Sequence, residues 1–223
     1  MPTIRIAPSE PPSLLPRNFH DVRPFAAQRA IRDPSVRAKL SGRYRKWPEI
    51  TGICFHQTAV ILGEKPRRYE SLGAHVAVTR GGKIILVHDF EKVVYHGNGW
   101  NNGCVGIEID GRYEGIEGDR STLWEQRLWK RSTTLTEETI SAAMELTRWI
   151  CGIVETRGGK VRVLVAHRQS SMTRRNDPGS AIWRRIVLPL HEELGLGDGG
   201  PGFAIGGRPL PDEWTGEDRG VPY

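Results

Sequence analysis

Short apolar runs and helix-spaced apolar positions alternate along this chain. Runs rich in β-branched residues predict strands over residues 53–58, 75–79, 83–87, 104–109 and 161–166, and Gly81-Gly82 between two of them indicates a hairpin. Helical spacing predicts helices over residues 24–40, 136–157 and 181–194. Thr136 is a suitable N-cap for the second helix, and Gly158-Gly159 ends it. Strands interleaved with helices favour a single-domain α/β fold, in which helices pack on a central mixed sheet.

The strand pattern also predicts which side chains avoid the core. Over residues 104–109, Val105, Ile107 and Ile109 share one face, so Glu108 points to the other. In the preceding strand, Cys54 and His56 share a face in the same way. A carboxylate and an imidazole are therefore expected on the faces of these two strands that point away from the core.

Composition narrows the class of protein. Of 223 residues, 38% are hydrophobic and 26% are charged, which is typical of a globular chain that can bury a core. No run of about eighteen apolar residues predicts a membrane span. The first residues lack the apolar centre of a signal peptide, so we expect synthesis in the cytoplasm. Three cysteines without a C-x-x-C pair argue against a disulfide framework.

Two residues near the last predicted strand suggest a metal site. His167 directly follows the 161–166 run and so lies at a strand end. Asp177 comes ten residues later, before Pro178, which disfavours a helical conformation for it. A catalytic zinc ion takes three protein ligands and leaves one position open. His56 is the candidate third ligand, and Cys54 on its face is either a further ligand or a buried inert thiol.

Five motifs occur in an order that resembles a known superfamily. They are I-C-F-H-Q-T-A, G-A-H-V-A-V-T-R-G-G-K-I, Y-H-G, V-G-I-E-I-D-G, and A-H-R followed by R-N-D-P-G. The chain resembles the zinc-dependent N-acetylmuramoyl-L-alanine amidases over about residues 50–194. That superfamily includes phage lysozyme-amidases, AmpD-like cytoplasmic amidases and peptidoglycan recognition proteins. The Asp ligand and its ten-residue distance from His167 resemble the AmpD-like arrangement.

The resemblance implies a role for each matching residue. It implies that His56, His167 and Asp177 bind a zinc ion (Zn2+). Ala74 stands where many members have a Tyr, which leaves proton transfer to Glu108, with Asp110 as the second candidate. Arg175 stands where the family usually has Lys and is expected to stabilise the oxyanion, with Arg174 as its less favoured substitute. His75 and His96 match positions near the cleft, where they either contact substrate or are structural.

The implied reaction is cleavage of the amide between N-acetylmuramic acid and the L-alanine of the peptidoglycan stem peptide. Within this reading, the chain is an endolysin that acts on the wall after another protein opens the membrane, or a cytoplasmic amidase that recycles muropeptides. A peptidoglycan-binding module without activity and a zinc hydrolase of another class are the remaining alternatives. We expect a monomer.

Charge distribution favours the lysin. Residues 1–50 hold ten Lys and Arg against four Asp and Glu, whereas the remaining residues hold 22 of each. We therefore divide the chain into a basic, Pro/Arg-rich arm (1–48), the amidase domain (49–195) and a Gly/Pro-rich tail (196–223). The arm is expected to bind anionic wall polymers, lipopolysaccharide or another polyanion, or to pack along the domain. Soluble muropeptides would need no such anchor.

Overall fold

The computed structural model describes residues 15–124 and 132–223. Its strands are β1 (Phe19–Asp21), β2 (Leu40–Tyr44), β3 (Gly52–Gln57), β4 (Val76–Val78), β5 (Ile84–Leu86), β6 (Lys92–Val94), β7 (Cys104–Ile109) and β8 (Val163–Ala166). Its helices are α1 (Arg23–Arg32), α2 (Pro34–Arg37), α3 (Glu137–Thr156), α4 (Ser180–Ile182), η7 (Trp183–Val187), α5 (Leu188–Leu194) and α6 (Asp212–Thr215). Short 3-10 turns are η1 (Trp47–Glu49), η2 (Pro66–Tyr69), η3 (Asn98–Trp100), η4 (Arg120–Thr122) and η6 (His167–Ser170).

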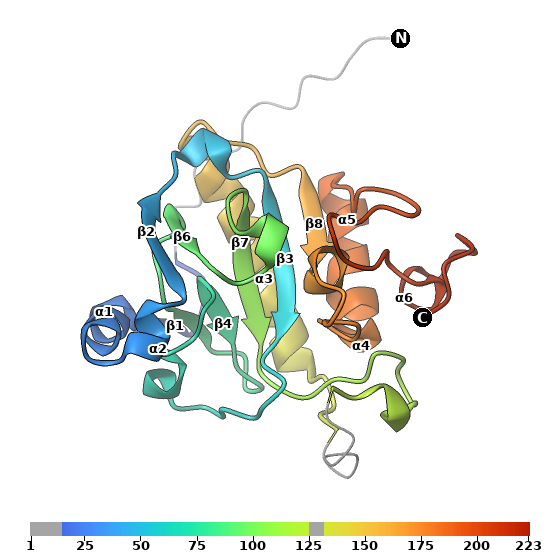
Figure 1. The fold of residues 1–223 in the computed structure, drawn as a ribbon, viewed down its shortest axis with the longest axis horizontal. Helices are drawn as coiled ribbons and strands as arrows, with labels where there is room; N and C mark the ends of the chain where they lie inside the picture. The colour runs from blue at the N-terminus through green and yellow to red at the C-terminus, as the bar shows by residue number, and fades with distance from the viewer. Residues whose placement is uncertain (1–14, 125–131) are drawn as a thin grey trace.

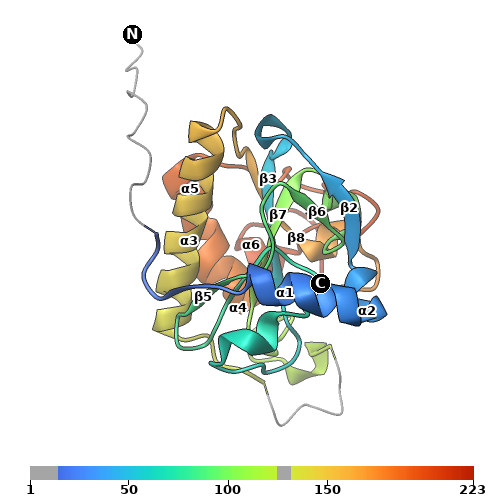
Figure 2. The ribbon, with the colours of Figure 1, turned by 90° about the vertical axis from the view of Figure 1, so that its left-hand side faces the viewer.

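A six-stranded sheet with the order β1-β5-β4-β7-β3-β8 forms the centre of the molecule (Figure 1). Strands β4 and β5 pair antiparallel, as the predicted hairpin requires, while β4, β7, β3 and β8 run parallel to one another. Helices α3 and α5 lie on one side of this sheet, and the β2–β6 ribbon lies on the other (Figure 2). The predicted α/β fold with a mixed central sheet is confirmed.

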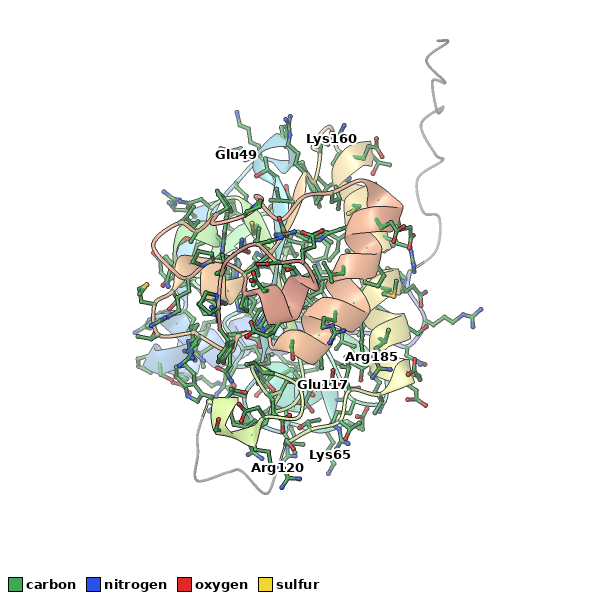
Figure 3. The ribbon with its side chains drawn as sticks, turned by 90° about the vertical axis from the view of Figure 1, so that its right-hand side faces the viewer. Glu49, Lys65, Glu117, Arg120, Lys160 and Arg185 are labelled. Carbon is green, nitrogen blue, oxygen red and sulfur yellow. The ribbon has the colours of Figure 1, made fainter. Side chains whose placement is uncertain are left out.

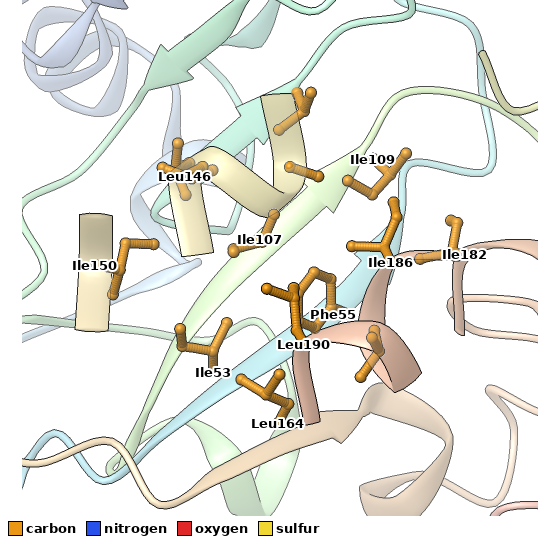
Figure 4. Close-up of a cluster of buried hydrophobic side chains, with 14 of the residues drawn as sticks. Ile53, Phe55, Ile107, Ile109, Leu146, Ile150, Leu164, Ile182, Ile186 and Leu190 are labelled. Atoms are coloured by element: carbon orange, nitrogen blue, oxygen red, sulfur yellow. The ribbon is translucent and has the colours of Figure 1, made fainter. Parts of the chain in front are cut away.

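The main hydrophobic core lies between the sheet and the helices (Figure 4). Alternate residues of β3 and β7 point into it, as the sequence pattern predicted, and none has measurable exposure: Ile53, Phe55, Val105, Ile107 and Ile109. They pack against the fully buried helix residues Leu146, Ile150, Ile182, Ile186 and Leu190. Because side chains alternate along a strand, His56 and Glu108 are directed to the opposite face.

Helix α3 begins and ends where its caps predict. The Thr136 hydroxyl accepts the backbone N–H of Thr139 at 3.2 Å, and the chain leaves the helix before Gly158, whose φ is +81°. Helical spacing places Ile140, Met144, Thr147, Cys151 and Val154 in one stripe, and the buried face of α3 is broader than this stripe. Met144 and Cys151 are only half-buried, since the centre of the face passes through Leu146 and Ile150.

Prolines explain two departures from the predicted helices. The helix expected over residues 24–40 is divided into α1 and α2 at Asp33, which is extended because Pro34 follows it. The helix expected over 181–194 is continuous but contains the π-helical turn η7. Pro189 cannot donate a backbone hydrogen bond to the preceding turn, and a wider turn accommodates this loss.

The described part of the expected N-terminal arm is built into the domain. Strand β1 extends the central sheet by pairing with β5, and β2 pairs with β6. Val22 and Ala26 are buried against the sheet. The division of the chain at residue 48 stays a prediction, and residues 1–14 lie outside the described residues.

The C-terminal segment also packs on the domain. Leu210 and Trp214 belong to the main core, and the Trp214 indole donates to the Gly115 carbonyl oxygen at 2.5 Å.

The surface of the domain is charged: side chains such as those of Glu49, Arg120 and Lys160 extend outward (Figure 3). Within the described ranges, no helix combines the length and the apolar character that a membrane crossing requires.

Candidate active site

Strand register brings the candidate site together. His56 on β3 is paired with Glu108 on β7, so the two side chains leave the same face of the sheet side by side. On the other side of β3, Phe55 is paired with Ala166, the last residue of β8. His167 follows Ala166 directly and therefore reaches His56 across the strand ends.

Three ligand-type atoms converge there. The Nδ1 atoms of His56 and His167 lie 3.0 Å apart, and Oδ2 of Asp177 lies 3.0 Å from the His167 atom and 4.0 Å from the His56 atom. All three side chains are buried. A tetrahedral zinc ion with ligand bonds of about 2.0–2.2 Å needs ligand atoms about 3–4 Å apart. The residues present therefore fit such an ion.

The loop that carries Asp177 is fixed by Gln57, which was not among the predicted site residues. The Gln57 backbone N–H donates to Oδ1 of Asp177 at 2.9 Å, so that Oδ2 is the oxygen that lies near His167. Its side-chain amide nitrogen lies 2.7 Å from the Asn176 carbonyl oxygen and 3.0 Å from that of Pro178. A Gln on the core side of a buried strand needs buried partners. A polar residue at this core-facing position of the strand is the sequence signal that could have revealed the role of Gln57.

His56 is held in its neutral form. Burial, and after it the electrostatic effects of His167, His96 and Arg174 in that order, keep the pKa of His56 well below its usual range. A neutral imidazole keeps a lone pair on one ring nitrogen, which metal binding requires.

Glu108 has the properties of a proton carrier. Its Oε2 is buried and has no hydrogen-bond partner among the described residues. Burial, followed by the negative charge of Asp177, raises the pKa of Glu108 to about 8, although the positive charge of Arg174 opposes the shift. A carboxyl group whose pKa lies near neutrality can both accept and return a proton.

The structure separates the two arginines before Asp177. Arg175 is exposed, donates to the Tyr223 carbonyl oxygen at 3.0 Å and lies 4.4 Å from the centre of the Tyr223 ring. Arg174 lies over Trp124 at 4.5 Å, and its charge acts on both His56 and Glu108. The assignment of Arg175 to the oxyanion stays a prediction, but this arrangement favours Arg174.

His75 and His96 are engaged within the protein. His75 is fully buried, accepts the Gly106 N–H at 2.9 Å through Nδ1, and has Nε2 2.9 Å from the Lys92 carbonyl oxygen. His96 is also buried and lies between His56 and β7. A substrate contact stays a prediction for both and would require these bonds to change.

Asp110, the second candidate for proton transfer, is fully buried and accepts the backbone N–H groups of Leu62 and Gly63 at 2.8 and 3.0 Å. It is engaged in holding a loop, unlike Glu108.

Residues 46–180, more than half of the chain, match the sequence model of the N-acetylmuramoyl-L-alanine amidase family. The chain belongs to this family. No curated protein sequence matches it.

Among solved structures, the amidase fold here is similar to the endolysin N-acetylmuramoyl-L-alanine amidase LysCS from Clostridium intestinale. The two are 14% identical, with a TM-score of 0.52, over 82% of this chain and 98% of that one. The endolysin of Thermus scotoductus bacteriophage Ph2119 is 18% identical over 72% of this chain and 91% of its own, with a TM-score of 0.46. Drosophila PGRP-LB is 15% identical over 69% and 86%, with a TM-score of 0.47.

A hollow of about 670 Å³ adjoins the loop that carries Asp177. Thr173, Arg175 and Asn176 of that loop line it, together with Trp124 and Tyr223. The connection after β7 therefore contributes to this surface up to Trp124. Trp129, the other tryptophan of this connection, lies outside the described residues.

Replacement of the two arginines should distinguish their roles. We expect Arg174→Ala to lower the turnover of a soluble muropeptide by about 10²-fold, as loss of an oxyanion-stabilising group does. Arg175→Ala is the matched control and should have a smaller effect on kcat, because its guanidinium is engaged by Tyr223. Arg174→Lys should restore much of the rate. A larger loss in Arg175→Ala would return the role to Arg175.

Proposed function

We propose that this protein is a zinc-dependent peptidoglycan hydrolase. It cleaves the amide between N-acetylmuramic acid and L-alanine of the stem peptide, and it acts on the bacterial wall as an endolysin. Membership of the amidase family supports the reaction class. The observation that most supports the proposal is the convergence of His56, His167 and Asp177 beside Glu108, whose buried Oε2 has no hydrogen-bond partner in the described part of the chain.

The proposed chemistry follows from these groups. His56, His167 and Asp177 would hold a zinc ion, which lowers the pKa of water to about 7 and polarises a carbonyl group when bound. Glu108 would accept the proton of the attacking water and return it to the leaving nitrogen. The guanidinium of Arg174 would place positive charge near the developing oxyanion. The hollow beside the Asp177 loop offers space for the stem peptide.

The lysin role is supported by surface charge. Residues 1–50 hold a charge excess of six, and the exposed Arg29, Arg32 and Arg37 on α1 and α2 are part of it. Such a surface attracts anionic wall polymers, although Arg29 is paired with Asp33 at 3.1 Å. Because residues 19–44 of this segment pair with the sheets and pack on the domain, the charges of α1 and α2 lie close to the domain surface.

His167→Ala should abolish stoichiometric zinc binding, because it removes the ligand atom that lies 3.0 Å from both other ligands. Metal analysis after gel filtration measures this. His20→Ala is the matched control, since His20 is a half-buried histidine of the edge strand β1 with no part in the cluster. Full zinc occupancy in His167→Ala would remove His167 from the site.

Glu108→Gln should keep zinc and the fold but lower turnover by about 10²–10⁴-fold, because it removes proton transfer with almost no change in shape. Zinc content and thermal unfolding are measured beside kcat, so that loss of the metal or of the fold is seen. Near wild-type turnover would assign proton transfer to another group.

The role in the cell is tested by comparing purified sacculi with a soluble muropeptide at rising ionic strength. An endolysin should hydrolyse sacculi, and this activity should fall with salt, since attraction between exposed charges is screened over about 8 Å at physiological ionic strength. Turnover of the soluble substrate should change little. Rapid turnover of free muropeptide with no activity on sacculi would instead indicate a recycling amidase.

A further inference from the structure

His96 occupies a defined place behind the metal-site histidine. Its Nε2 lies 3.1 Å from the carbonyl oxygen of Cys104, and its Nδ1 lies 3.0 Å from Nε2 of His56. A carbonyl oxygen only accepts, so His96 must donate through Nε2. In a neutral ring the other nitrogen then carries a lone pair, and Nδ1 of His96 accepts the N–H of His56.

This chain of bonds determines which nitrogen of His56 is free. With its proton on Nε2, His56 keeps a lone pair on Nδ1, the atom 3.0 Å from Nδ1 of His167 and 4.0 Å from Oδ2 of Asp177. We propose that His96 is a positioning residue that fixes the tautomer and the ring orientation of His56 for metal binding. The inference rests on the proposed zinc site, and it gives His96 a positioning role in place of direct contact with the substrate.

The surrounding backbone is shaped around the His96 ring. A Cβ atom at Gly106 would lie 2.8 Å from Cγ and Nδ1 of His96, closer than real contacts allow. His75 lies edge-on to the ring, with centroids 5.4 Å apart, and is itself held by the Gly106 N–H. Gly106 is the glycine of the V-G-I-E-I motif, so this close approach gives a physical reason for a glycine there.

A second metal ion is the competing explanation for the same atoms. The ligand atoms of Cys54, His56 and His96 also lie within 4.8 Å of one another. That arrangement would need the proton of His56 Nε2 to leave and Cys54 to ionise. Hydrogen bonding from His56 to His96 needs neither change.

The test compares zinc affinity among His96 variants by competition with a chelator. His96→Phe keeps a planar ring but removes both bonds and should weaken zinc binding about 10–100-fold, as loss of a partner behind a metal ligand does. His96→Gln can accept from His56 and donate to Cys104, so it should restore most of the affinity. Gly106→Ala removes no polar group but displaces the ring, and it should also weaken binding.

Nuclear magnetic resonance of the zinc-loaded wild-type protein gives an independent measurement that needs no variant to fold. The His56 ring should show a protonated Nε2 and a metal-bound Nδ1. A metal-bound Nε2 would overturn the proposal. So would a His96→Phe variant that binds zinc as tightly as wild type and loses only substrate affinity, or a second equivalent of zinc that Cys54→Ala removes. Failure of the wild-type protein to bind zinc at all would instead contradict the proposed function.

Discussion

The candidate site depends on the parallel register of β3 with its two neighbours. Pairing of His56 with Glu108 places the imidazole beside the carboxylate, and pairing of Phe55 with Ala166 brings His167 to the same strand ends. A shift by one residue would turn every side chain of β3 to the other face, with His56 in the core and Phe55 in the site. The fully buried apolar residues of β3 and β7 oppose that shift, so core packing and site geometry stabilise one register.

Buried polar contacts then hold the site residues in the places that the strand register gives them. Gln57 holds the Asp177 loop on one side of β3, and His96 contacts His56 on the other. Buried polar groups are expensive unless they are bonded, so these contacts specify a single arrangement. Glu108 is the exception within the site, because Oε2 is buried without a partner; elsewhere in the described residues the same holds for Arg112 Nε and Trp183 Nε1. An oxygen atom whose hydrogen-bonding capacity is unused is consistent with a group that exchanges a proton during the reaction.

Runs of β-branched residues predicted the central strands, Gly81-Gly82 the hairpin, and Thr136 and Gly158 the ends of α3, because these features depend on local chemistry. The ligand set could be proposed because His56, His167 and Asp177 lie at strand ends or beside a proline. Packing of the arm along the domain was one of two expectations, but the pairing of β1 with β5 was not predictable, since a three-residue edge strand carries almost no periodic signal. The different contacts of Arg174 and Arg175 were not predictable either, because their partners Trp124 and Tyr223 are remote in sequence.

Mass spectrometry of the products from a defined soluble muropeptide shows directly which bond the protein cleaves. We expect the zinc-loaded protein to add one water and to release a stem peptide with a free L-alanine amino group and an intact N-acetylmuramic acid carrying a lactyl carboxylate. Removal of zinc should stop the reaction, and its return should restore it. Cleavage at any other bond, equal cleavage without metal, or binding of the muropeptide with no cleavage would contradict the account.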